Sequence, residues 1–102
     1  MDLGLSDATA VVVGGGRGMG LAAARCLADD GARIALVGRN SDVLDSAAAE
    51  LSGRGSPDAV GLSADVEDEE QVERVFAEIG ARWGGELNIL INQANATRAK
   101  DD

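Results

Sequence analysis

Residues 10–20 read Ala-Val-Val-Val-Gly-Gly-Gly-Arg-Gly-Met-Gly, an apolar run that stops at a cluster of glycines. Gly14, Gly18 and Gly20 follow the pattern G-x-x-x-G-x-G. The spacing G-x-G-x-x-G is absent, and Leu21 stands where a P-loop has its lysine. When a strand turns through glycines into a helix, the helix N-terminus offers unpaired N–H groups to an anion. We therefore expect a phosphate-binding turn here; the alternative is a glycine turn that holds no ligand.

Each glycine of this pattern has its own expected role. Gly14 supplies the tight turn out of the strand, Gly18 lets a phosphate approach the backbone, and Gly20 lets the helix pack against the strand. The other candidate ligand contacts in the turn are Gly16, Arg17 and Met19.

Four short apolar runs alternate with helical patterns along the rest of the chain. The runs are residues 10–13, 33–37, 59–62 and 87–91. Near-continuous apolar strands are typical of a parallel sheet covered on both faces. The sequence therefore predicts an α/β fold with a doubly wound, Rossmann-type parallel sheet of about four strands and three helices.

The three helical segments have distinct start and stop signals. The first, residues 19–30, is rich in Ala and is closed by Gly31, and the second, residues 41–52, has Ser41 as a candidate N-cap. Residues 52–58 then read as a turn-rich link. The third begins at a capping box formed by Asp68 and Gln71. Its expected core face is made by Val72, Phe76, Ile79 and Trp83.

Composition narrows the class of partner. The chain has 102 residues, nine Lys plus Arg against eighteen Asp plus Glu, and a formal charge of −9. Such a surface repels nucleic acid and anionic membranes, so neither is an expected partner. The absence of His and the single cysteine, Cys26, exclude most zinc sites and any Cys–His nucleophile pair, so no metal site is expected. The acidic start lacks the features of a signal peptide, and a cytoplasmic location is expected.

The end of the second apolar run indicates which dinucleotide would bind. An acidic residue there would hydrogen-bond the ribose 2′-hydroxyl of NAD, but residues 36–40 read Leu-Val-Gly-Arg-Asn. Arg39 can form charge-assisted hydrogen bonds to a 2′-phosphate, with Arg17 as a second cation and Asn40 as a neighbouring contact. NADP is therefore favoured over NAD. The alternative is that either arginine is an ordinary surface residue.

These motifs together resemble the short-chain dehydrogenase/reductase family over about residues 6–96. The family has T-G-x-x-x-G-x-G in the glycine turn, an Asp after the third strand and N-N-A-G after the fourth. Here residues 63–66 read Ser-Ala-Asp-Val and residues 92–95 read Asn-Gln-Ala-Asn. The resemblance implies strand order 3-2-1-4, with Asp65 bonded to the adenine amino group and Val66 lining the adenine pocket. It places Asn92 and Ala94 beside the adenosine ribose.

The sequence departs from the family pattern in three ways. Val13 replaces the Thr of the glycine motif, and Gln93 and Asn95 bring side chains to a place where the family keeps the backbone close to the cofactor. The family's catalytic Ser, Tyr and Lys follow the fourth strand, whereas this sequence has no Tyr and its single Lys is Lys100. We expect residues 1–96 to form a partial NAD(P)-binding domain, followed by a polar tail at 97–102, in a truncated chain that is inactive alone.

The resemblance implies an oxidoreductase that transfers hydride between NADPH and a carbonyl or alcohol substrate. The carbonyl substrate would be a ketone and the alcohol a secondary alcohol. Two alternatives remain open, a non-catalytic dinucleotide-binding module and a nonfunctional remnant. In the expected strand order, residues 87–91 form an exposed apolar edge, so self-association through the fourth strand is a further expectation.

Overall fold

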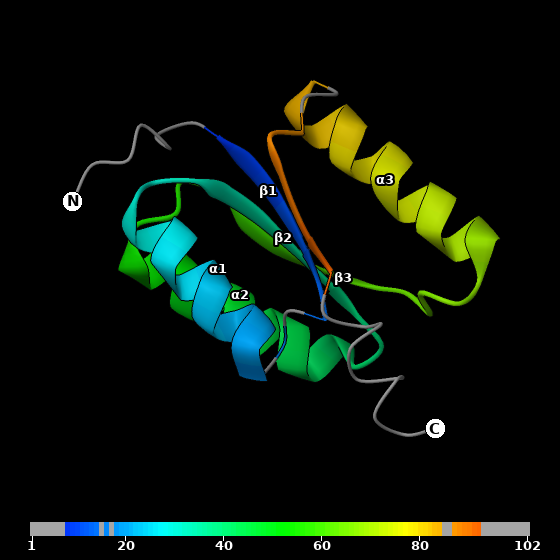
Figure 1. The fold of residues 1–102 in the computed structure, drawn as a ribbon, viewed down its shortest axis with the longest axis horizontal. Coiled ribbons are helices and arrows are strands. Elements are labelled where there is room, and N and C mark those ends of the chain that lie inside the picture. Colours follow the sequence, from blue (N-terminus) through cyan, green and yellow to red (C-terminus); the bar gives the residue numbers. More distant parts are fainter. Residues whose placement is uncertain (1–7, 15, 17, 85–86, 93–102) are drawn as a thin grey trace.

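A computed structural model describes residues 8–14, 16, 18–84 and 87–92. Within this part of the chain, four parallel strands form one sheet in the order β3-β2-β1-β4, and three helices cover it. The elements are β1 (Thr9–Val13), α1 (Gly18–Asp29), β2 (Arg33–Gly38), α2 (Ser41–Arg54), β3 (Ala59–Ser63), α3 (Glu69–Trp83) and β4 (Ile89–Asn92). Helices α1 and α2 lie on one face of the sheet and α3 on the other (Figure 1). The doubly wound α/β fold and its strand order are confirmed.

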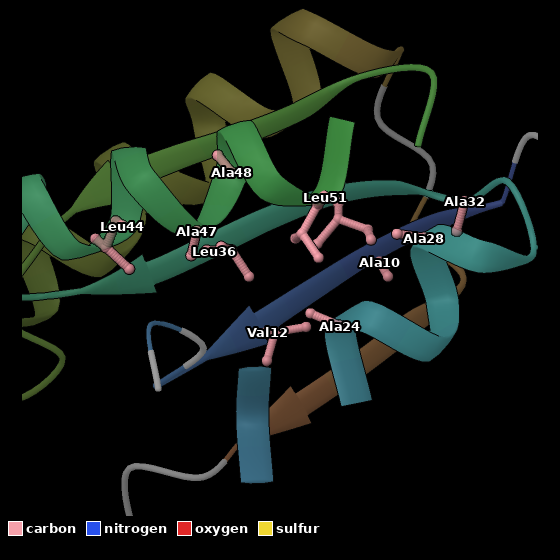
Figure 2. Packing of buried hydrophobic residues seen from close by; sticks show 11 residues of the cluster. Ala10, Val12, Ala24, Ala28, Ala32, Leu36, Leu44, Ala47, Ala48 and Leu51 are labelled. Atoms are coloured by element: carbon pink, nitrogen blue, oxygen red, sulfur yellow. The ribbon is translucent and has the colours of Figure 1, made fainter. Parts of the chain in front are cut away.

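The central strands β1 and β2 are apolar beyond their first residues, Thr9 and Arg33, because both of their faces are covered. Every residue of β1 is buried, as are the four inner residues of β2. On the face covered by α1 and α2, Leu36, Leu44 and Leu51 pack among alanines of both helices (Figure 2). Small side chains in α1, such as Ala24 and Ala28, allow this close approach of helix to sheet. Each fully buried leucine contributes about 1.5–3 kcal/mol to the stability of the fold.

Strand β4 begins two residues later than the apolar run that predicted it. Ile89 to Asn92 pair with β1 in parallel, in a register that sets Val13 opposite Asn92. Asn88 also contacts β1, but partly through its side chain. Its Oδ1 accepts a hydrogen bond of 2.9 Å from the Thr9 N–H, and its own N–H donates to the Thr9 carbonyl at 3.0 Å.

Helix α2 differs from the prediction at both of its ends. The N-cap is Asn40 rather than Ser41, because the Asn40 Oδ1 accepts a hydrogen bond of 3.1 Å from the Val43 N–H. The helix continues through Arg54, so the predicted link at 52–58 is wrong for its first three residues. It ends at Gly55, whose φ of 134° lies in a region that glycine tolerates.

Helix α3 begins at the predicted cap, Asp68, whose side chain accepts hydrogen bonds from the Glu70 and Gln71 N–H groups. Its buried face is rotated from the predicted one. Val75, at 2% exposure, and Ile79, at 3%, are its buried residues. The remaining predicted core residues, Val72, Phe76 and Trp83, are only half-buried.

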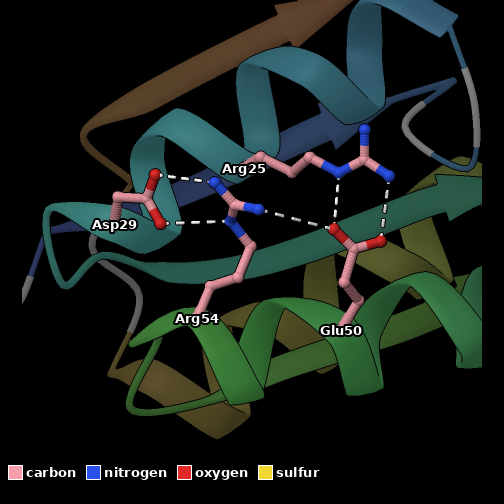
Figure 3. Close-up of polar contacts among 4 residues, drawn as sticks. All are labelled: Arg25, Asp29, Glu50 and Arg54. Atoms are coloured by element: carbon pink, nitrogen blue, oxygen red, sulfur yellow. Dashed lines mark hydrogen bonds and ion pairs between the residues drawn. The ribbon is translucent and has the colours of Figure 1, made fainter.

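Two ion pairs join α1 to α2 across their outer faces (Figure 3). The Arg25 guanidinium donates to both oxygens of Glu50, and the Arg54 guanidinium donates to both oxygens of Asp29. The hydrogen bonds from Arg25 hold the pKa of Glu50 below its ordinary value, and those from Arg54 do the same for the pKa of Asp29.

No helix in the described part of the chain is long and apolar enough to span a bilayer.

Candidate nucleotide-binding site

The candidate site lies at the carboxyl ends of the strands, which parallel pairing brings to one edge of the sheet. Gly14 follows β1 with a φ of 81°, and its N–H donates a hydrogen bond of 2.7 Å to the Val37 carbonyl of β2. Gly18 opens α1 with a φ of 64°, and Gly20 is buried in the first turn of that helix. Because L side chains rarely adopt positive φ, Gly14 and Gly18 are required by the backbone itself.

Gly16 is constrained by α2 rather than by its own backbone. A Cβ atom on Gly16 would lie 2.9 Å from Val43 Cγ1 and 3.3 Å from Leu44 Cδ2. The absence of a side chain therefore lets the glycine turn pack against α2, a structural role that spacing alone did not indicate. The neighbouring candidate Met19 is 77% exposed, which leaves its side chain accessible to a ligand. Arg17 lies outside the described residues.

Arg39 follows β2 directly, at the same edge of the sheet. Its Nη2 lies 3.0 Å from Glu67 Oε2 and 3.3 Å from Asp65 Oδ1, although its side chain is 67% exposed. Its carbonyl accepts a hydrogen bond of 3.1 Å from the Ser63 hydroxyl at the end of β3. The structure thus brings together Arg39 and Asp65, two predicted site residues from different strands. It adds Glu67, which the sequence reading did not single out.

Asn40, another predicted contact, is used in the fold. Its Oδ1 caps α2, and its carbonyl accepts a hydrogen bond of 3.0 Å from the Leu44 N–H. This residue therefore fixes where α2 begins beside Arg39.

The loop that carries Asp65 is held by a chain of hydrogen bonds to the start of α3. The Asp65 N–H donates to the Gln71 Oε1 at 2.8 Å, and the Gln71 Nε2 donates to the Asp68 Oδ2 at 3.1 Å. The predicted capping box is therefore only half right. Asp68 caps α3, but the carbonyl oxygen of Gln71 reaches Asp65 instead of the Asp68 N–H. Gln71 therefore positions the backbone of Asp65, whereas the motif spacing predicted that it would cap α3.

A cavity of about 140 Å³ lies between the sheet edge and α3. Its lining includes Val66 and Asn92, two predicted adenosine contacts that the fold brings to one place. The other lining residues are Val13, Val37, Val72, Val75, Phe76 and Leu90. All of these lining residues except Asn92 are apolar, as suits the face of a flat heterocycle. Of the remaining motif residues, Ala94, Gln93 and Asn95 lie outside the described part of the chain.

The strand order, the glycine turn between β1 and α1, and the cluster after β2 and β3 define an α/β protein of the nucleotide-binding type. The family model for short chain dehydrogenase matches residues 8–102. The chain belongs to this family.

Relatives and solved structures agree with this assignment. The chain is 42% identical over 89 residues to carbonyl reductase family member 4 of Danio rerio, covering 87% of this chain and 36% of that protein. It is 40% identical over 92 residues to the 3-oxoacyl-[acyl-carrier-protein] reductase of Bos taurus, covering 90% and 37%. The chain therefore spans little more than a third of the length of these curated relatives.

Two structural neighbours were solved with a nicotinamide cofactor. L-sorbose reductase from Gluconobacter frateurii, complexed with NADPH and L-sorbose, matches with a TM-score of 0.86 and 36% identity, covering 92% of this chain and 35% of that one. The RhlG/NADP active-site complex of Pseudomonas aeruginosa matches with a TM-score of 0.79 and 32% identity, covering 88% and 35%.

Proposed function

We propose that this chain carries the nucleotide-binding part of an NADP-dependent short-chain dehydrogenase. The reaction of the whole protein would be hydride transfer between the cofactor and a ketone or a secondary alcohol, with the nicotinamide ring supplying the hydride chemistry. The observation that carries the proposal is the position of Arg39. Its exposed guanidinium follows β2 at the sheet edge where Gly14 and Gly18 lead into α1.

The residues present fit this cofactor. Gly18 opens α1 with a positive φ, and a Cβ added there would meet nothing within 4 Å. A phosphate could therefore approach the first turn of α1, whose N–H groups favour an anion. The apolar cavity lined by Val66 and Asn92 suits the adenine ring. The carboxylate of Asp65, the residue before Val66, would accept a hydrogen bond from the adenine amino group. Arg39 would bind the 2′-phosphate, which NAD lacks.

The proposed division of the chain is a partial NAD(P)-binding domain at residues 1–96 and a polar tail at 97–102. The family's Tyr-based proton transfer has no counterpart within these residues, because the sequence contains no Tyr. We therefore expect the 102-residue chain to bind cofactor without turning over a ketone. The second candidate function, a non-catalytic dinucleotide-binding module, rests on the same observation.

The exposed side of β4 supports self-association of the isolated chain. In the described residues β4 pairs with β1 alone, and Leu87 and Leu90 are 41% and 54% exposed. An unpaired strand edge of this kind is a template for a second chain.

A thermal-shift comparison tests the cofactor proposal. Ligand binding to the folded state raises its apparent stability according to affinity, so NADPH should raise Tm more than NADH does. A tenfold difference in affinity corresponds to about 1.4 kcal/mol, or a difference in Tm of roughly 5–10 °C in a domain of this size.

Arg39→Ala should abolish the difference in Tm shift between the two cofactors. Arg25→Ala, which removes an arginine of the α1–α2 ion pairs, should preserve it. Equal shifts with NADPH and NADH in the unaltered chain would refute the NADP assignment.

A further inference from the structure

We infer that Glu67 is a specificity-determining residue of this site, one that competes with a 2′-phosphate for Arg39 and narrows the preference for NADP over NAD. The inference rests on the proposed function. Its starting observation is that the guanidinium expected to bind a phosphate already faces two carboxylates, Glu67 at 3.0 Å and Asp65 at 3.3 Å.

The two carboxylates differ in their expected role in nucleotide binding. The family resemblance implies that Asp65 accepts a hydrogen bond from the adenine amino group, so a carboxylate at that position serves cofactor binding. Glu67 is no part of the family motif, and its ion pair with Arg39 joins residues 28 positions apart in the sequence. This pair places a carboxylate 3.0 Å from the guanidinium that is proposed to bind the 2′-phosphate.

The backbone holds both partners in position. The Glu67 N–H donates a hydrogen bond of 2.9 Å to the Asp65 Oδ1, and Asp65 is in turn fixed through Gln71 to the start of α3. On the other side, Ser63 donates to the Arg39 carbonyl. The backbone on both sides of the pair is therefore tied by hydrogen bonds, which keep the two side chains within reach of each other.

A 2′-phosphate entering this site would meet an unfavourable balance of charge. Arg39 would have to exchange Glu67 for the phosphate, and the carboxylate released would remain close to a second anion. NAD, whose ribose carries a neutral 2′-hydroxyl, would meet no such repulsion. The Glu67 side chain is 45% exposed, so solvent screens the pair and the effect is moderate. Exposed ion pairs of this kind change affinity by about two- to fivefold.

The test compares Glu67→Gln with the unaltered 102-residue chain and with Glu69→Gln. The control removes the same charge two residues further on, at a side chain with no hydrogen bond or ion pair among the described residues. Dissociation constants are measured by calorimetry for NADPH and NADH, and for adenosine 2′,5′-bisphosphate and adenosine 5′-monophosphate. The last two probe the 2′-phosphate without involving the nicotinamide half of the site.

Glu67→Gln should tighten binding of NADPH and of the bisphosphate about two- to fivefold, and change NADH and the monophosphate by less than about 1.5-fold. Glu69→Gln should leave the ratio of the two affinities unchanged. An unaltered or smaller ratio in Glu67→Gln overturns the inference while leaving NADP binding intact. If the folded chain and both variants bind none of the four ligands, the proposed function itself fails and the inference with it. If only Glu67→Gln binds NADPH and the bisphosphate, while the unaltered chain and Glu69→Gln do not, the result supports the inference.

Discussion

The indole Nε1 of Trp83 donates a hydrogen bond of 2.8 Å to Oδ2 of Asp58. The Arg82 guanidinium holds both oxygens of the same carboxylate at 2.9 Å. Asp58 directly precedes β3, whereas Arg82 and Trp83 end α3, so one carboxylate ties the helix to the sheet. The hydrogen bonds from Arg82, and then that from Trp83, hold the pKa of Asp58 below its ordinary value against the opposing effect of burial.

Asp58→Asn should lower the free energy of unfolding by about 1–2 kcal/mol at neutral pH, because the Arg82 ion pair is lost. The carboxyl has a lower pKa in the folded than in the unfolded state. Its contribution is therefore fully present above the unfolded value of about 4 and is lost as pH falls through the folded value. In urea unfolding, the difference between Asp58→Asn and the unaltered chain should be larger at pH 7 than at about pH 2.5.

The matched control is Asp45→Asn, which alters an exposed carboxylate on α2 with no hydrogen bond or ion pair among the described residues. It should change the unfolding free energy by less than about 0.5 kcal/mol at either pH. Because Trp83 is the single tryptophan, its fluorescence should shift in acid in the unaltered chain before global unfolding. A stability difference for Asp58→Asn that persists unchanged in acid would contradict the assigned role of the ion pair.

Gly61→Ala should destabilise the fold by about 1–3 kcal/mol. Gly61 lies in the middle of β3, and an added Cβ would lie 2.8 Å from Leu44 Cβ and 2.9 Å from the Leu44 carbonyl carbon in α2. Since the obstacle includes backbone, the helix must shift away from the sheet. Gly53→Ala is the control, because a Cβ there meets nothing within 4 Å inside α2. That change should stabilise the chain by about 0.5–1 kcal/mol, and equal effects of the two substitutions would contradict the packing argument.

The sheet could be predicted from sequence because its signals are local. β1 and β2 are buried on both faces, so they are apolar beyond their first residues, and the glycine cluster marks where β1 turns into a helix. The start of α2 could not be predicted to the residue, because two neighbouring residues are suitable N-caps. Asn40 and Ser41 are both good N-caps, and the backbone decides between them by bringing the Asn40 oxygen to the Val43 N–H.

The site was less predictable because its contacts are not local. Glu67 stands among other acidic residues between Asp65 and Asp68, and no motif in the sequence singles it out. Only the pairing of β2 with β3 brings it to Arg39. Val75 was missed for a related reason. Helical periodicity indicates an apolar stripe but does not say which edge of the stripe meets the sheet, and α3 turns Val75 inward.

Asn88→Ala should lower the unfolding free energy by about 1–2 kcal/mol. The substitution removes the oxygen that accepts the N–H of Thr9, a residue only 2% exposed, and leaves that donor without its partner. Asn88→Asp keeps an acceptor oxygen in the same place and should restore most of the stability. Amide hydrogen exchange at Thr9 should accelerate in Asn88→Ala and not in Asn88→Asp. Unchanged exchange in both variants would mean that the side chain does not hold the start of β1.

Self-association of the chain should depend on salt, because two effects oppose each other at β4. The exposed edge and Leu90 favour pairing with a second copy, whereas the formal charge of −9 on each chain repels it. Raising the ionic strength from about 0.01 to 0.15 M shortens the Debye length from about 30 to about 8 Å and should increase the weight-average mass in light scattering.

Leu90→Lys distinguishes association through the edge of β4 from nonspecific hydrophobic association. It places a charge on the edge strand and should keep the chain monomeric at the higher ionic strength. The control, Ala49→Lys, adds the same charge to an exposed position of α2 and should still associate. Because both variants change the net charge equally, a difference between them reports the location of the contact. If the unaltered chain stays monomeric at every ionic strength, or if both variants associate alike, β4 is not the surface through which copies meet.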